Sequence, residues 1–256
     1  MIAVETGEVE GAAGPETDTG TPLSRGKNNR LVRSCLIESS FVEEVKQMPA
    51  RSYGQFCGLA RALDAVGDRW SLLIVRELLP GPMRYSELVA SLGGIATNLL
   101  ADRLRSLESS GVIERRLGQT SGVVYALTPW GSQLREAIEV LIRWSIPLMA
   151  SGPGGDVFQP RWLAVALEAL LRGRTAKPPA ELGIEVAGLF MTLRIGKDGP
   201  HVTVQPDRRP DTILKAEPEA VLGLAAGAIT IDQALSRASV HGDPRVLTTV
   251  LGAAQT

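Results

Sequence analysis

The amino-acid sequence predicts a chain of the α+β class, in which a mainly helical part with a β-hairpin precedes a second α+β part. Three observations support this prediction: helical periodicity up to about residue 110, two short β runs after it, and alternating runs beyond residue 158. At 256 residues the chain is long enough for two domains of ordinary size. We expect a disordered extension, a first domain, a linker and a second domain at residues 1–51, 52–150, 151–157 and 158–256.

The extension is predicted from its composition. Residues 1–30 are rich in Gly, Thr, Glu, Ala and Pro and have few large apolar side chains to bury. Residues 31–47 favour a short amphipathic helix. Translation starting at Met48 is an alternative, which peptides upstream of that residue would exclude.

The first domain opens with two helices. Leu59, Leu63 and Val66 share one face of the first. The second, from about residue 68, is apolar around most of its girth, as a central buried helix should be. Pro80 and the proline two residues later end it.

A helix-turn-helix pattern follows. Ser86 is predicted as the N-cap of one helix and Thr97 as the N-cap of the next, which spans residues 97–110. Between them, two glycines permit a tight turn. Gly111 is placed to end the second helix. The buried stripe of that helix consists of Leu100, Leu104 and Leu107.

Two strands, Ile113–Leu117 and Val123–Leu127, are predicted to form a hairpin around a polar tip. This order of elements predicts a winged helix-turn-helix, a fold that can place one helix in a DNA major groove and its hairpin on the flanking backbone. A last helix at residues 131–150 has an apolar stripe that exceeds the needs of one small domain and indicates a dimer partner. The stripe consists of Leu134, Ile138, Leu141, Ile142 and Ser145.

The second domain begins with a helix in the segment RWLAVALEALLRG. Alternating β runs are predicted at Gly183–Ile195 and His201–Gln205, with a turn at Lys197-Asp198-Gly199 between them. Short helices are expected at about 217–226, 230–237 and 244–252. We therefore expect one curved antiparallel sheet covered by helices.

The first domain resembles the HxlR family of winged-helix bacterial transcription regulators. The resemblance is carried by Cys57, Trp70 in DRWSLLIVREL, RYSEL at 84–88, GI at 94–95, LLADRLRSLESSGVIERR at 99–116 and YALTPWG at 125–131. It implies a homodimer that binds double-stranded operator DNA, usually near its own promoter. Gly58 is a departure, because the family often has Pro there.

The second domain is similar to sterol carrier protein type 2-like domains. The segments that carry this resemblance are PDTILKAEPEAVLGLAAG and the ending ITIDQALSRASVHGDPRVLTTVL. It implies a small apolar ligand held between sheet and helices.

Residues 52–150 carry ten arginines, no lysine and nine acidic side chains, so DNA affinity must depend on where the charges lie. Asn98 and Arg105 have the side chains suited to adenine and guanine edges. Asp102 is expected to pair with Arg105 or with the arginine at 103. The alternative is a solvated helix face and a polar hairpin whose charges pair locally. The candidate DNA-contacting residues are Arg84, Thr97, Asn98, Ala101, Arg103, Arg105, Arg115, Arg116, Thr120 and Ser121.

Cys57 is a candidate redox residue, because the resemblance implies that the equivalent cysteine senses electrophiles or oxidants in some members. Its place at the start of a helix is expected to lower its pKa. The alternative is a small buried hydrophobe at a dimer contact. Trp70 and Trp144 are predicted to be packing residues.

The sequence shows no signal peptide, no membrane span and no disulfide framework, which favours a reduced cytoplasm. His201 and His241 lack the spacing of metal ligands, and we find no nucleophile and base pattern, phosphate loop or dinucleotide motif. We therefore expect no catalytic residues, no metal, no cofactor and no enzyme activity.

We predict a cytoplasmic, homodimeric transcription regulator that acts as a repressor. Its dimer contacts would involve the first helix and the helix at 131–149. The second domain would be either a pocket for a small apolar effector or a dimerisation module. Two alternatives stay open: a redox-sensing regulator acting through Cys57, and a lipid-binding protein whose winged helix makes protein contacts.

Overall fold

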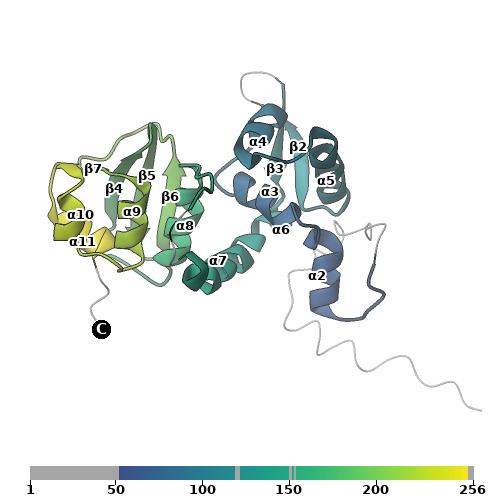
Figure 1. Ribbon diagram of the computed structural model, residues 1–256, viewed down its shortest axis with the longest axis horizontal. Coiled ribbons are helices and arrows are strands. Elements are labelled where there is room, and N and C mark those ends of the chain that lie inside the picture. The colour runs from purple at the N-terminus through teal and green to yellow at the C-terminus, as the bar shows by residue number, and fades with distance from the viewer. Residues whose placement is uncertain (1–51, 119–121, 150–151, 153, 253–256) are drawn as a thin grey trace, which may run out of the picture. The chain divides into compact units, whose positions relative to one another are not determined.

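The computed structural model describes residues 52–118, 122–149, 152 and 154–252 (Figure 1). Two hydrophobic clusters organise this part of the chain. One cluster gathers buried side chains from the first predicted domain, and the other gathers those from the second. Val165 crosses this division, because it packs in the first cluster although its helix mainly lines the second. The described residues all belong to one unit. The predicted extension lies outside them, and the domain boundaries stay a prediction.

Helices and a three-stranded antiparallel sheet of order β1-β3-β2 surround the first cluster. Ile74 and Val75 are fully buried in its central helix, as the apolar pattern predicts. The predicted order of helix, turn, helix and hairpin is confirmed, so this part is a winged helix-turn-helix. Its elements are α2 (Gly58–Val66), α3 (Ser71–Leu78), β1 (Met83–Arg84), α4 (Tyr85–Leu92), α5 (Thr97–Ser109), β2 (Ile113–Leu117), β3 (Val123–Leu127), α6 (Pro129–Ser132), α7 (Leu134–Ser145) and the 3-10 helix η1 (Ile146–Met149).

Two helix starts differ from the prediction. The N-cap of α4 is Arg84 and not Ser86, because the carboxylate of Glu87 accepts the backbone N–H of Arg84 at 2.6 Å. The N-cap of α5 is Ala96, so Thr97 is its first helical residue. Strand β1 was not expected, since two residues are too few to show an alternating pattern.

The single helix predicted for residues 131–150 is divided into α6, α7 and η1. Thr128 caps the short helix α6 by accepting a backbone N–H at 2.9 Å. In the predicted dimer stripe, Ile138 is buried and Leu134 and Ile142 are partly buried against the first cluster of the same chain. Three of the five residues of this stripe therefore pack within one chain, whereas Leu141 is exposed, as are Val140 and Trp144 of the same helix.

Helices and a five-stranded sheet of order β6-β5-β4-β7-β8 enclose the second cluster. Helix α8 packs on β6, and α11 packs on β4 and β5. The helices predicted at about 217–226, 230–237 and 244–252 are confirmed as α9, α10 and α11. The elements are α8 (Trp162–Leu170), β4 (Ala180–Val186), β5 (Leu189–Gly196), β6 (Gly199–Val204), β7 (Ile213–Lys215), α9 (Pro218–Ala225), α10 (Ile231–Leu235), β8 (Ser239–His241) and α11 (Arg245–Leu251).

This sheet corrects two expectations. It is mixed and not antiparallel throughout, because β4 and β7 run parallel. The β run predicted at Gly183–Ile195 is two strands, joined by a two-residue turn in which Ala187 and Gly188 have φ values of 47° and 79°. Alanine is uncommon at positive φ, so the sequence carried only one of the two usual turn signals. The turn predicted at residues 197–199 is confirmed between β5 and β6.

Candidate nucleic-acid interface

Helix α5 presents one face to the core and the other to solvent. Its leucines at 100, 104 and 107 are buried, as their spacing predicts. Most positions on the remaining surface are exposed or half-buried among the residues that the structure describes. It carries the exposed residues Thr97, Asn98, Asp102 and Arg105, with the half-buried Ala101 and Arg103 among them.

Hydrogen bonds fix both ends of α5. At its start, the hydroxyl of Tyr85 on α4 donates to the carbonyl of Thr97 at 2.7 Å. At its end, Gly111 has a φ of 73°, and its N–H and that of the next residue donate to carbonyls of the last turn at 3.0 and 2.9 Å. The hydroxyl of Thr128 donates to the carbonyl of Gly111 at 2.7 Å and ties this end to the hairpin. The predicted helix end is thus confirmed, and α5 is held as a rod.

Each candidate arginine on α5 and β2 has an acidic partner. The pairs are Arg103 with Asp68 (2.6 Å), Arg105 with Asp102, Arg115 with Glu108 (2.8 Å) and Arg116 with Glu114 (2.6 Å). The local pair of Asp102 and Arg105 confirms the prediction. The hydrogen bond that Arg115 donates to the carboxylate of Glu108 raises the pKa of Arg115. Exposed ion pairs of this kind contribute only about 0–1 kcal/mol, so a DNA phosphate can replace the carboxylate readily.

Two further candidates lie at helix starts. Asn98 accepts the N–H of Leu99 at 2.9 Å through its side-chain oxygen, which satisfies a donor of the first turn of α5. Arg84 is exposed at the N-cap of α4, beside the start of the helix-turn-helix.

The hairpin of β2 and β3 is the wing, and its predicted bounds are confirmed. Arg115 and Arg116 alternate along β2, and both side chains are more than half exposed, at 59% and 53%. Arg115 reaches back to α5, whereas Arg116 pairs along its own strand. Thr120 and Ser121 lie outside the described residues.

The sequence analysis missed three exposed residues near these candidates. Leu117 and Val123 form the last residue pair between β2 and β3, and they are 88% and 50% exposed. Such an apolar pair suits contact with deoxyribose in a minor groove. Arg69 is exposed beside Asp68, the partner of Arg103. The sequence shows only that each of these positions has an apolar or a basic residue. The fold shows that the side chains are exposed to solvent.

Cys57 occupies the N-cap of α2 and is exposed. Hydrogen bonds from the backbone N–H groups of Ala60 and Leu59 lower the pKa of its thiol, as its position predicts. The thiolate fraction at neutral pH is therefore raised.

Apolar side chains of α2, α7 and η1 remain exposed. Trp144 is 72% exposed, which corrects its prediction as a packing residue of the chain, whereas Trp70 does pack against the first cluster. Such a surface is typical of a contact with another protein chain. The exposed apolar side chains are Phe56 just before α2, Leu59 and Leu63 on α2, Val140, Leu141 and Trp144 on α7, and Ile146, Leu148 and Met149 in η1.

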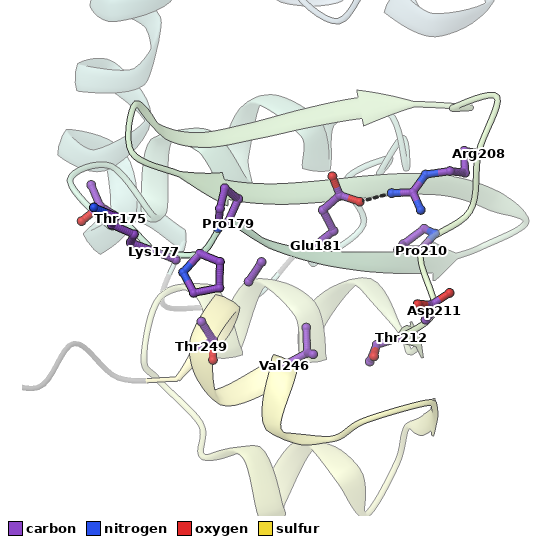
Figure 2. A pocket seen from close by; sticks show the side chains of 13 residues that line it. Thr175, Lys177, Pro179, Glu181, Arg208, Pro210, Asp211, Thr212, Val246 and Thr249 are labelled. Atoms are coloured by element: carbon purple, nitrogen blue, oxygen red, sulfur yellow. Dashed lines mark hydrogen bonds and ion pairs between the residues drawn. The ribbon is translucent and has the colours of Figure 1, made fainter.

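A cavity of about 600 Å³ lies between the start of β4, the loop before β7 and α11 (Figure 2). Three prolines and Val246 give it apolar walls. Its remaining wall is polar, because Glu181 and Arg208 join across it at 2.6 Å. This cavity is more polar than the resemblance to sterol-carrier-like domains implies.

Among the residues that the structure describes, no group of three or more His, Cys, Asp or Glu side chains is placed to hold a metal ion. His201 lies near a carboxylate, with its Nδ1 3.4 Å from Glu168. No described helix combines the length and apolar character that crossing a bilayer requires.

Comparisons with known proteins agree with this geometry. A family model described as HxlR-like helix-turn-helix matches residues 65–151. The HTH-type transcriptional regulator YodB of Bacillus subtilis is 34% identical over 86 residues, which cover 33% of this chain and 77% of YodB. The HTH-type transcriptional regulator Rv3095 of Mycobacterium tuberculosis is 36% identical over 119 residues, or 46% of this chain and 67% of the relative. The solved structure of reduced YodB is 29% identical, covers 38% of this chain and 99% of its own, and has a TM-score of 0.34. The chain therefore belongs to the HxlR-like helix-turn-helix family of transcriptional regulators and is a DNA-binding regulator.

Proposed function

We propose that the protein is a homodimeric, cytoplasmic repressor that reads an operator with α5 and sets its wing on the adjacent backbone. The observation that carries this proposal is the exposed face of α5, which bears Asn98 and Arg105 on a helix fixed at both ends. An arginine can bind a guanine edge through two hydrogen bonds, and each good pair of this kind contributes about 1–3 kcal/mol of discrimination.

The arginine pairs explain how a nearly neutral domain can bind DNA. A phosphate that approaches Arg103, Arg115 or Arg116 takes the place of a carboxylate that holds its arginine only weakly. Arg84, Thr97, Ala101, Thr120 and Ser121 complete the proposed contact surface. Because phosphate contacts release counterions, affinity should fall steeply with salt.

The exposed apolar side chains of α2 and α7 support a homodimer. Val140, Trp144 and Leu148 recur on one face of α7 and η1, and Leu59 and Leu63 on α2 add to the apolar surface. Two copies joined through these helices would present two α5 helices to half-sites about 34 Å apart.

The second part of the chain supports regulation by a small ligand. Its α+β architecture is consistent with a sterol-carrier-like domain, and the cavity beside α11 has room for a small molecule with an apolar body and a polar end. An effector of this kind typically changes DNA affinity by about 1–3 kcal/mol through its preference for one dimer state.

A gel shift on the DNA upstream of the protein's own gene, with random competitor, tests this function. We expect a competitor-resistant complex that weakens with salt, and we expect Arg105→Ala to relax specificity at one base pair. Equal loss on every sequence would mean that Arg105 touches only phosphate. Binding that does not depend on salt would favour the lipid-binding alternative, in which the winged helix contacts protein.

A second candidate, thiol-based control, is favoured by the exposed Cys57 with its lowered pKa. The pKa shift leaves more thiolate at neutral pH than an ordinary cysteine has, and the thiolate is the reactive form. Replacing Cys57 with Ser should then abolish any loss of DNA binding that an oxidant causes. An unchanged oxidant response would exclude this candidate.

A further inference from the structure

The carboxyl end of α3 is held by two arginines from elsewhere in the chain. The last carbonyls of a helix have no partners within it, and they form the negative end of its dipole. Arg161, at the N-cap of α8, donates to the carbonyl of Glu77 on α3 at 3.5 Å and to that of Gly81 in the following turn at 3.2 Å. Arg135 on α7 donates to the carbonyl of Leu79, the C-cap residue of α3, at 3.1 Å. Partial burial lowers the pKa of both arginines. Hydrogen bonds from residues of α8 and α7 thus hold the turn that follows α3.

A buried carboxylate extends this clamp to α4. Glu77 on α3 is only 1% exposed. Its side chain accepts hydrogen bonds from the indole N–H of Trp162 at 2.6 Å and from the hydroxyl of Ser91 on α4 at 2.5 Å. Arg76 donates to the same carboxylate at 3.1 Å and lies 4.1 Å over the ring of Trp162. One carboxylate therefore joins α3, α4 and the first residue of α8.

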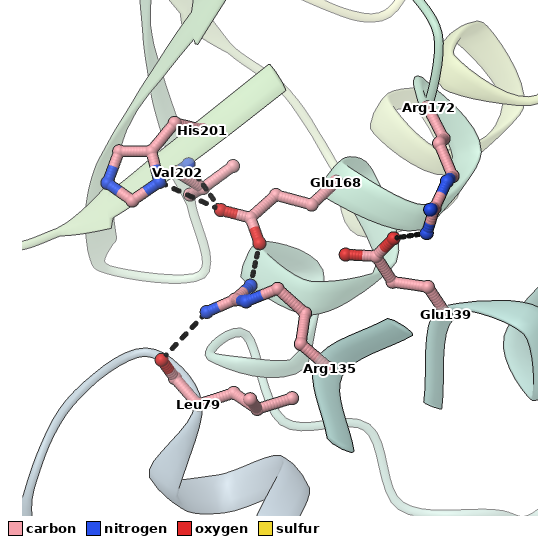
Figure 3. Close-up of polar contacts among 7 residues, drawn as sticks. All are labelled: Leu79, Arg135, Glu139, Glu168, Arg172, His201 and Val202. Atoms are coloured by element: carbon pink, nitrogen blue, oxygen red, sulfur yellow. Dashed lines mark hydrogen bonds and ion pairs between the residues drawn. The ribbon is translucent and has the colours of Figure 1, made fainter. Parts of the chain in front are cut away.

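The same helix is tied to the sheet of the second cluster (Figure 3). Glu168 on α8 is nearly buried and accepts a hydrogen bond from Arg135. Its other oxygen accepts the N–H of Val202 on the edge strand β6 at 2.8 Å. Further along, Arg172 and Glu139 join the end of α8 to α7 at 2.9 Å. Helix α8 thus contacts the helix-turn-helix at one end and the second sheet along its length.

The geometry points to α8 as a positioning element for DNA binding, with Trp162 as its principal positioning residue. A carboxylate as buried as that of Glu77 depends on its hydrogen-bond donors, and removing the indole N–H leaves it with only those of Ser91 and Arg76. The indole N–H of Trp162 holds Glu77, Glu77 holds Ser91, and α4 in turn holds the start of α5 through Tyr85. The position of the DNA-reading helix therefore depends on a helix that lies outside the winged helix-turn-helix.

Trp162→Phe in the full chain tests this inference, which rests on the operator binding proposed above. Phenylalanine keeps an aromatic ring beside Arg76 and Phe158 but removes the N–H. We expect the operator dissociation constant to rise about tenfold at a temperature where the protein is folded. Amide hydrogen exchange in α4 and at the start of α5 should also become faster in the absence of DNA.

Val250→Ala is the matched control. Val250 on α11 is fully buried in the second cluster, so its loss lowers thermal stability without touching Glu77 or Trp162. The control should leave operator affinity and α4 exchange unchanged. Equal losses of affinity in both variants, or a lower melting temperature with unchanged affinity in Trp162→Phe, would overturn the inference.

A second variant and a measurement without DNA distinguish the failure of this inference from the failure of the proposed function. Ser91→Ala removes the α4 partner of Glu77 and should accelerate exchange in α4 if Trp162→Phe does not fold. If the wild-type chain does not bind the upstream DNA, the operator proposal fails. The exchange measurement still decides the role of α8, because it needs no DNA: unchanged exchange in α4 would refute that role.

Discussion

At the scale of single residues, each candidate arginine on α5 and β2 pairs with an acidic neighbour, and under the proposed function these pairs determine how strongly the surface attracts DNA. Asp102 pairs with Arg105 one turn away on α5, and both side chains are largely exposed. The sequence could predict this pair from the spacing of three residues. It could not predict the pairs of Arg103 with Asp68 or of Arg115 with Glu108, because only the folded chain brings those residues together.

Asp102→Asn should increase DNA affinity. The change removes one negative charge from the DNA-facing side and releases Arg105 for a phosphate or a base. We expect affinity to rise about three- to tenfold at low salt, and the salt dependence to steepen by about one phosphate contact. Fluorescence anisotropy with a labelled duplex at several salt concentrations measures both quantities.

Asp207→Asn is the control for net charge, because Asp207 is exposed in a loop of the second part of the chain. It should change affinity little. Equal gains from both substitutions would show that total charge, and not the release of Arg105, governs binding.

Thr192→Val should stabilise the protein. The hydroxyl of Thr192 on β5 is the one buried side-chain polar atom without a hydrogen-bond partner among the described residues. A buried hydroxyl without a partner destabilises the folded state, and valine has nearly the same shape. We expect the free energy of unfolding to rise by about 1 kcal/mol, seen as a melting temperature about 2–4 °C higher. Thr203→Val, at the exposed partner position on β6, should have a smaller effect.

At the scale of helices and strands, the sequence predicts elements best where local chemistry defines their ends. Gly111 ends α5, and both strands of the wing have the predicted bounds. A glycine at a helix end and alternating apolar residues are local signals, so the sequence alone predicts them. The strand β1 and the turn at Ala187 were missed. A strand of two residues is too short to show an alternating pattern, and an alanine does not indicate a positive φ.

The apolar stripe of α7 that predicted a dimer partner is mostly covered by the chain itself. Its periodicity correctly shows a surplus of apolar residues, but periodicity does not say which of them the chain covers itself. Ile138 lies inside the first cluster, whereas Trp144 lies in solvent. The exposed face became visible only once α3 and α8 were packed against the other side of this helix.

Trp144→Glu should therefore weaken a homodimer without unfolding the chain. Because Trp144 is exposed in the single chain, the substitution removes no packing within it. A buried tryptophan at an interface commonly contributes about 2 kcal/mol or more, so the dimer dissociation constant should rise about 30-fold or more. Sedimentation velocity across a concentration series measures this shift.

Operator binding by Trp144→Glu should fall in parallel, since one chain can occupy only one half-site. Val157→Glu is a matched control at another exposed apolar position. An unchanged dimer in Trp144→Glu would exclude this face of α7 as the interface.

At the scale of the whole molecule, α8 joins the two hydrophobic clusters. Its residues Leu163, Ala164 and Leu167 line the second cluster, and Val165 packs in the first. The helical period of the segment was predictable from sequence. Its double role was not, because a helix that is apolar on most sides gives no indication of which neighbour covers each side.

Thermal unfolding should accordingly be one cooperative transition. Unfolding the second cluster would remove the partners of Glu77 and Arg135, so the first cluster should not persist alone. Differential scanning calorimetry should give one peak with equal calorimetric and van't Hoff enthalpies per cooperative unit. Two separated peaks would show that the clusters unfold independently.

The shared helix also determines where this chain can be recombined with others. One possible chimera joins the winged helix-turn-helix head of this chain, through residues 151–157, to the second domain of another protein. It would keep Glu77 and lose Trp162. A junction after α8 would keep the contact of Trp162 with Glu77, but it would separate Glu168 from Val202. A working graft therefore needs either a matched pair of residues at positions 77 and 162 or a head taken from a relative with the same second domain.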